Sequence, residues 1–405
     1  MELFNGKKKN KLISVKDIKI EGMLILLALL IGAICGVIGG AFAKSISLVT
    51  ELRAENQWLV YLLPVAGLVS VGIYKLTKTE GIGTLRALES ARGEAKTPII
   101  LVPVIFVASV LTHLFGGSAG KEGAALQIGS GIAEIFSKIT KADDKMRSAL
   151  TMCGMAGLFS AAFGTPVGAC VFALEIAFDG SVQTLAVLPA AISSVTAFVV
   201  AVALGGTPER FHIGLMPDFG VSVLLKTVLE SAVVAAVGIV FCWMLIGGEK
   251  LSEKLLKNPL ARIFIGGCVV IILTLIFGTD YNGGGMAVIE RVFETGTVRP
   301  EAFLLKIIFT VVTVCAGYKG GEIVPSLFIG ATLGAVLSPI LGLPVDFCAA
   351  IGITAFFARV TNCPIASAFI AAELFGTEGF LLFAVAAFVP RVFSDKISLY
   401  QRTNK

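Results

Sequence analysis

The chain has 405 residues, of which 56% are hydrophobic and 15% are charged, and its mean hydropathy is +0.90. Soluble domains carry about 25% charged residues, so this composition excludes a water-soluble enzyme and predicts a polytopic α-helical membrane protein. The net charge of +5 comes from tails and loops rather than from one face, so it does not indicate nucleic-acid binding.

The cysteines and histidines do not form a recognisable chemical site. Most of the eight Cys lie inside apolar runs, and no spacing resembles a disulfide framework or a zinc site. The two His, His113 and His212, are too few for an HExxH metalloprotease. An intramembrane enzyme would need a nucleophile–base pair or a metal cluster, and neither is visible. We therefore expect no enzyme, no metal and no cofactor.

The chain begins with a basic segment. Its first twenty residues hold six lysines, which are Lys7, Lys8, Lys9, Lys11, Lys16 and Lys19. The segment is too polar for a signal peptide, and the positive-inside rule predicts a cytoplasmic tail over residues 1–22. Lys396, Arg402 and Lys405 predict a second cytoplasmic tail over residues 392–405, with no cytosolic regulatory domain after it.

Apolar runs of uneven length fill the chain between the two tails. Several are too short to cross the roughly 30 Å of a bilayer core, and several contain Gly, Pro or a charge. This pattern is typical of tilted and broken helices. The runs are Met23–Phe42, Leu59–Tyr74, Pro98–Gly120, Ser148–Leu174, Ser181–Thr207, Ser231–Gly248, Ile263–Thr279, Ile307–Tyr318, Ile323–Val345, Val360–Ala372 and Gly379–Val389.

The chain repeats itself. Pro166 and Glu175 match Pro364 and Glu373 at one constant offset, and an upstream block repeats at nearly the same offset. Two blocks in the same order predict duplication, with membrane halves over 23–207 and 219–391. Inverted repeats are the common transporter arrangement and place the substrate site at their interface.

Each half contains a glycine-rich break followed by a helix start. Gly116–Gly123 (GGSAGKEG) follows one apolar run and precedes another, so we expect a new helix to begin near Glu122. The segment Gly320–Pro325 (GGEIVP) repeats the design. Free N–H groups and the positive end of a helix dipole attract anions. Two such helix starts aimed at one point predict a site for a desolvated anion.

Glu122 is the predicted gate. A carboxylate at an anion-attracting helix start competes with the transported anion when ionised, and swings away when protonated. Burial favours its neutral form and the helix start favours its charged form. An acid within the membrane is a functional candidate by default.

Glu322 occupies the matching helix start. It is either a second proton carrier or an ion-pair partner of Lys121 or Lys319. We expect Glu175 and Glu373 to cap or pair structurally, and Arg359 to satisfy a carbonyl or a carboxylate.

These residues resemble the CLC family of anion channels and proton-coupled anion transporters over nearly the whole membrane chain. Gly120–Ala124 (GKEGA) resembles the G(K/R)EGP motif, which places the gate on Glu122. Gly320–Pro325 resembles GGxFxP, whose backbone amides line the central anion site, here Ile323 and Val324. The resemblance also implies anion contacts from Lys121, Gly123, the Gly81-Ile82-Gly83 segment (degenerate GSGIP) and Tyr400 of the terminal SDKISLY segment.

The departures from the family motifs indicate which branch of the family the chain resembles. Ile82 replaces the motif's Ser, Ala124 replaces Pro, and Ile176 stands where the inner proton glutamate is expected. With Glu322 at a position that is not acidic in ordinary chloride members, the chain resembles the bacterial fluoride-exporting antiporters. Fluoride is strongly hydrated, so its site must supply close donors.

The resemblance implies a CLC-type inverted-repeat fold, a homodimer in the cell (plasma) membrane, contact with the lipid bilayer, and exchange of fluoride for protons. A chloride/proton antiporter and a passive chloride channel on the same scaffold remain alternatives, and the missing inner glutamate favours the channel. A cation or amino-acid transporter with broken helices is a further alternative.

Overall fold

The computed structural model describes residues 15–177, 183–393 and 399–400, with side chains described from Glu21 onward. These residues form sixteen α-helices and two 3₁₀ helices, and they contain no β-strand beyond one isolated bridge. The first half holds α1 (Val15–Glu55), η1 (Gln57–Leu62), α2 (Leu63–Leu76), α3 (Thr84–Ala91), α4 (Leu101–Leu114), α5 (Glu122–Ile139), α6 (Asp144–Phe163), α7 (Pro166–Ala177) and α8 (Thr184–Ala203).

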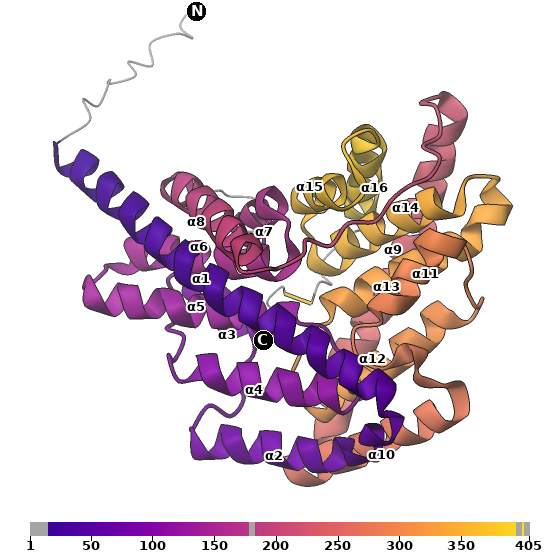
Figure 1. The fold of residues 1–405 in the computed structure, drawn as a ribbon, viewed down its shortest axis with the longest axis horizontal. Coiled ribbons are helices and arrows are strands. Elements are labelled where there is room, and N and C mark those ends of the chain that lie inside the picture. The colour runs from indigo at the N-terminus through magenta and orange to yellow at the C-terminus, as the bar shows by residue number, and fades with distance from the viewer. Residues whose placement is uncertain (1–14, 178–182, 394–398, 401–405) are drawn as a thin grey trace, which may run out of the picture.

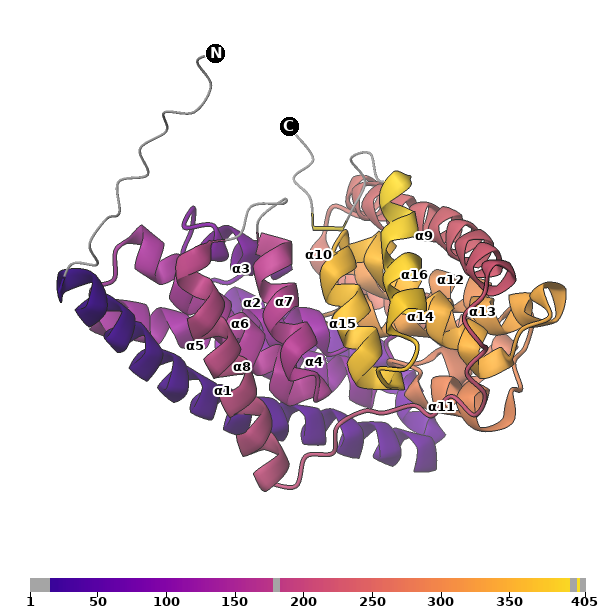
Figure 2. The ribbon, with the colours of Figure 1, turned by 90° about the horizontal axis from the view of Figure 1, so that it is seen from above.

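The second half follows a linker over residues 204–220. It holds α9 (Val221–Leu255), α10 (Pro259–Phe277), η2 (Thr279–Tyr281), α11 (Met286–Thr295), α12 (Ala302–Ala316), α13 (Ile323–Leu341), α14 (Val345–Thr361), α15 (Pro364–Phe375) and α16 (Phe380–Val392). The two halves lie side by side, and the linker passes along one face from α8 to α9 (Figures 1 and 2).

Helix lengths are uneven, as the apolar runs predict. Six helical segments of the described chain are long and apolar enough to cross a membrane. Others are shorter, such as α7 and α15 with twelve residues each. Twelve residues rise only about 18 Å, less than the thickness of the hydrocarbon core, so such helices are too short to cross it.

Two predicted runs prove to be broken. Ser148–Leu174 divides where Gly164 adopts a left-handed conformation (φ 73°) and α7 restarts at Pro166. Val360–Ala372 divides where Asn362 adopts φ 59° and α15 restarts at Pro364. Hydropathy alone did not separate these helices, because the break residues are few and most of the flanking residues are apolar. The breaks occupy repeat-related positions.

The first helix is longer than its predicted run. The run ends before Lys44, but α1 continues to Glu55. Lys44 and Glu51 are exposed, so their charges do not interrupt the helix.

The core is built from repeat-related helix pairs, α5 with α6 and α13 with α14, and these helices are largely buried. Glycines allow the close approach: a Cβ added to Gly129 would collide with the carbonyl of Gly154, and one added to Gly330 would lie 2.5 Å from the carbonyl oxygen of Gly352. Small residues at such contacts let membrane helices pack backbone to backbone. The pairs hold the starts of α5 and α13 in fixed positions.

Candidate anion site and gate

The starts of α5 and α13 meet at the boundary between the halves. Gly120 and Gly321 form an antiparallel bridge in which each backbone N–H donates to the other's carbonyl at 2.6 Å. Lys121 and Glu322 are the N-cap residues of the two helices. The expectation that two helix starts converge on one point is therefore confirmed.

Glu122 occupies the point between the helix starts. Its side chain is fully buried, and its Oε2 accepts a hydrogen bond from the Val324 N–H at 3.2 Å. Its Oε1 is buried and has no hydrogen-bond partner among the described residues. A carboxylate on the free N–H of a helix start occupies the position that the helix start offers to an anion.

Glu322 and Tyr400 lie together next to this point. The Tyr400 side chain is 4% exposed and interacts with the Glu322 carboxyl. Backbone pairing of Leu399 with the Val360 carbonyl at 3.3 Å holds this part of the chain on α14. Residues 394–398 of the predicted terminal motif lie outside the described residues.

The cations proposed as ion-pair partners of Glu322 have other partners. Lys121 Nζ lies 2.8 Å from Glu209 Oε1, and Lys319 Nζ lies 4.6 Å from the centre of the Tyr74 ring. Among the described residues, neither ammonium forms an ion pair with Glu322.

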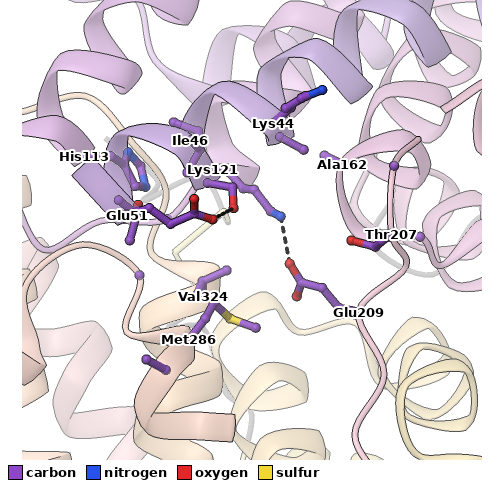
Figure 3. A pocket seen from close by; sticks show the side chains of 18 of the residues that line it. Lys44, Ile46, Glu51, His113, Lys121, Ala162, Thr207, Glu209, Met286 and Val324 are labelled. Atoms are coloured by element: carbon purple, nitrogen blue, oxygen red, sulfur yellow. Dashed lines mark hydrogen bonds and ion pairs between the residues drawn. The ribbon is translucent and has the colours of Figure 1, made fainter. Parts of the chain in front are cut away.

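A cavity of about 910 Å³ lies beside the start of α5, and we call it the linker-side cavity because residues 204–209 of the linker help to line it. Gly120, the residue before Lys121, also lines it, and Lys121, Glu209 and Val324 lie in its wall (Figure 3). The Lys121 ammonium also lies 5.1 Å from the centre of the Phe163 ring. Lys121 therefore points into the cavity wall rather than toward Val324. Glu209 was not predicted, since nothing in the linker sequence marks it as a neighbour of the gate.

The Gly81-Ile82-Gly83 segment forms the turn before α3. Ile82 packs partly buried against the core, and the next hydroxyl along the chain, Thr84 Oγ1, would lie 3.0 Å from a Cβ added to Gly123. Gln127 Nε2 donates to Thr84 Oγ1 at 3.3 Å. Thr84 thus brings a hydroxyl beside the start of α5. The sequence signal for Thr84 is its position directly after the Gly81-Ile82-Gly83 segment, in which Ile82 replaces the motif's Ser.

Glu175 and Glu373 have the structural role that we predicted. Glu373 accepts from the N–H groups of Val167 and Gly168 at 3.0 and 2.7 Å, and Glu175 accepts from those of Ile365 and Ala366 at 3.1 and 2.7 Å. Each acid therefore caps a helix of the other half, where a carboxylate satisfies free N–H donors.

Arg359 is buried on α14. Its side chain is 2% exposed, and among the described residues its Nε and Nη1 have no hydrogen-bond partner. The side chain packs against α9 at Gly238, where an added Cβ would lie 2.8 Å from Arg359 Cγ.

One buried lysine near the site was not predicted from the sequence. Lys306 is fully buried and donates to the carbonyls of Tyr281 and Gly283 at 3.0 and 2.7 Å. The loop that it holds packs Gly284 against Val324, beside the gate. The sequence signal is the position of Lys306 directly before the apolar run Ile307–Tyr318. A lysine at that position was interpreted as the boundary of the run and not as part of the helix.

The chain is similar to known anion transporters along most of its length. It is 30% identical over 383 residues to the chloride/fluoride channel protein of Pseudomonas syringae pv. tomato, covering 92% of this chain and 84% of that protein. It is 25% identical to the H⁺/Cl⁻ exchange transporter ClcA of Vibrio cholerae, covering 87% of this chain and 81% of that protein.

Solved structures agree with this similarity. A CLC-type fluoride/proton antiporter superposes with a TM-score of 0.90 at 30% identity, covering 96% of this chain and 98% of that one. A slow cyanobacterial Cl⁻/H⁺ antiporter shares the fold with a TM-score of 0.78 at 19% identity, covering 93% and 96%. The family model for the voltage gated chloride channel matches residues 66–395. The chain is therefore a membrane protein of the voltage gated chloride channel (CLC) family.

Proposed function

We propose that this protein exchanges fluoride for protons across the cell membrane, with Glu122 as gate and first proton carrier and Glu322 as second proton carrier. The observation that carries the proposal is the position of Glu122, whose carboxylate accepts the free N–H of Val324 at the start of α13. An anion and this carboxylate compete for the same donor, so the anion binds when Glu122 leaves.

Proton coupling follows from the same competition. Ionised Glu122 holds the helix-start donor, whereas protonated Glu122 loses its charge and its advantage over the anion. Each departure of the gate then requires a proton, and each return releases one. Glu322, in contact with Tyr400, lies next to the helix starts and carries the proton in place of the missing inner glutamate.

Fluoride needs several close donors to replace its hydration shell. The proposed donors are the backbone amides of Gly123, Ile323 and Val324 and the Tyr400 hydroxyl, together with the Gly81-Ile82-Gly83 turn. Lys121, which the resemblance also implied, pairs with Glu209 instead. The 30% identity to proteins described as a chloride/fluoride channel and a fluoride/proton antiporter supports fluoride as the substrate.

The proposal is tested in proteoliposomes with a fluoride electrode and a pH electrode read together. We expect wild type to release fluoride while taking up protons. We expect Glu122→Gln to abolish proton uptake, because an amide cannot carry the proton. Unchanged coupling in Glu122→Gln would exclude Glu122 as the gate. Replacement of the exposed Glu378 by Gln is the matched control and should leave both signals intact.

The second candidate is a chloride/proton antiporter or a passive chloride channel. Ile176, in place of the expected inner glutamate, favours the channel because it removes one proton carrier. A chloride reversal potential that ignores the pH gradient would identify a channel, and one that shifts with the gradient would identify an exchanger.

Assembly and orientation belong to the proposal as well. We propose a homodimer in the lipid bilayer with both termini in the cytoplasm. The proposed division of the chain is a basic tail over 1–22, membrane halves over 23–207 and 219–391, and a short tail over 392–405. The start of α1 and the end of α16 lie away from the linker face (Figure 2), which supports termini on one side. Crosslinking in membranes tests the homodimer. The accessibility of cysteines introduced into the two tails tests the orientation of the termini.

A further inference from the structure

We infer that Glu209 is a positioning residue that holds Lys121 away from the Glu122 gate and thereby sets the pH at which the gate opens. The inference rests on the proposed function. It concerns a cation directly beside the gate in sequence and an acid from the linker between the halves. Neither the family motif nor the spacing of the repeats assigns Glu209 a role.

The first observation is the ion pair itself. Lys121 Nζ and Glu209 Oε1 are 2.8 Å apart, and their side chains are only 12% and 20% exposed. Partial burial makes such a pair stronger than an exposed one and weakens its screening by salt. Lys121 is also held over the Phe163 ring, which adds a cation–π contact. The ammonium therefore has one well-defined position, on the side of the cavity away from Val324.

The second observation is that the linker fixes Glu209 on both sides. Before it, Pro208 packs so closely on Gly164 that an added Cβ there would lie 2.6 Å away. After it, Arg210 donates to the Gly164 carbonyl at 3.1 Å, and the N–H of Phe211 donates to the Leu374 carbonyl at 2.9 Å. The backbone of Glu209 is thereby held, and its carboxylate is a fixed anchor for a flexible lysine.

The third observation is an unused acceptor. In the part of the chain that the structure describes, Glu209 Oε2 is buried and has no hydrogen-bond partner. A buried acceptor without a donor is costly, and this one lies in the wall of the linker-side cavity. The oxygen is placed to accept a donor that enters the cavity.

The electrostatic consequence has a definite sign. Lys121 precedes Glu122 directly, and a lysine without Glu209 is free to turn toward the gate carboxylate. A cation within about 4–6 Å of a carboxylate favours its charged form by about 1–3 pH units. Ionised Glu122 would then keep the Val324 donor, and the gate would open only at more acidic pH. Glu209 prevents this by neutralising Lys121.

Other charged groups face the same cavity from each surrounding element. They are Lys44, Glu51 and Arg53 of α1, His113 of α4, Asp280 of η2 and Glu290 of α11. Among the described residues, Lys121 and Glu209 pair only with each other. The other groups contribute to the general field in the cavity, and a control must separate that field from the pair.

The experiment measures fluoride efflux and proton uptake in proteoliposomes across a range of pH. We expect Glu209→Gln to move the half-maximal pH toward acid by about one unit, which lowers efflux about tenfold above the midpoint. Lys121→Gln should move it toward alkaline pH, because the unpaired Glu209 then disfavours ionised Glu122. The double variant, which has neither charge, should return close to wild type.

Glu51→Gln is the matched control, since it removes one exposed carboxylate from the same cavity and should leave the profile unchanged. Recovery in the double variant separates a charge effect from a folding defect, because a structural role predicts that two substitutions harm more than one. The inference is overturned if Glu209→Gln titrates like wild type, or if both single variants shift in the same direction. Wild type that moves fluoride without protons would instead refute the proposed function.

Discussion

Thr84 is the residue that best explains how this site manages without the motif's serine. Ile82 offers no donor, but the Thr84 hydroxyl lies beside Gly123, and Gln127 donates to its oxygen. A hydroxyl that accepts from an amide keeps its own hydrogen free to donate. Thr84 can therefore direct that hydrogen toward an anion next to the start of α5.

We expect Thr84→Val to lower fluoride efflux about tenfold, because a hydrogen bond to a charged partner contributes about 1.5–3 kcal/mol. Valine keeps the shape and removes only the hydroxyl. Ile82→Ser in the same assay should raise chloride transport relative to fluoride by restoring the lost donor. Efflux is measured by the fluoride electrode at saturating fluoride. If Thr84→Val shows wild-type efflux there, Thr84 does not contribute to the anion site.

At the scale of elements, the two halves are joined by exchanged helix caps. Glu373 of α15 caps α7, and Glu175 of α7 caps α15. Both helices begin at a proline, and each carboxylate binds two N–H groups at the start of the other helix. The first N–H groups of a helix have no acceptor within the helix, so each carboxylate satisfies donors that would otherwise lack a partner.

Glu373→Ala should destabilise the protein by about 1–3 kcal/mol, since it leaves two N–H donors of α7 without an acceptor. Thermal unfolding in detergent measures this as a lower midpoint. Glu378→Gln, an exposed acid three residues beyond α15, should leave the midpoint unchanged. Equal midpoints for Glu373→Ala and wild type would show that the cap does not stabilise the folded state.

These caps also show what the sequence could and could not reveal. The matched Pro and Glu positions disclosed the duplication, and a glutamate near the end of an apolar run suggested a cap. The partner could not be read, because a cap across the halves depends on how two distant segments are arranged. The same reason hid Glu209, whose place at the gate is decided by the path of the linker. Glu122 was found because its neighbours in sequence are also its neighbours in space.

At the scale of the whole molecule, the gate lies where the two halves are hydrogen-bonded to each other. The Gly120–Gly321 bridge links the starts of α5 and α13, and Glu122 lies between them. A Cβ added to Gly321 would lie 2.5 Å from the Gly123 nitrogen and 3.2 Å from Glu122 Oε2. The proposed gate and the boundary between the halves therefore share one close backbone contact.

We expect Gly321→Ala to lower coupled fluoride efflux at least tenfold while the protein still folds, because the added methyl forces the two helix starts apart by a small distance at a site that depends on close donors. Gly72→Ala is the matched control, since its Cβ meets nothing within 4 Å in the interior of α2. Efflux and the unfolding midpoint are measured on the same preparations. A variant with normal efflux would mean that the bridge is packing alone, whereas lost efflux with a retained midpoint places the ion path at the contact between the halves.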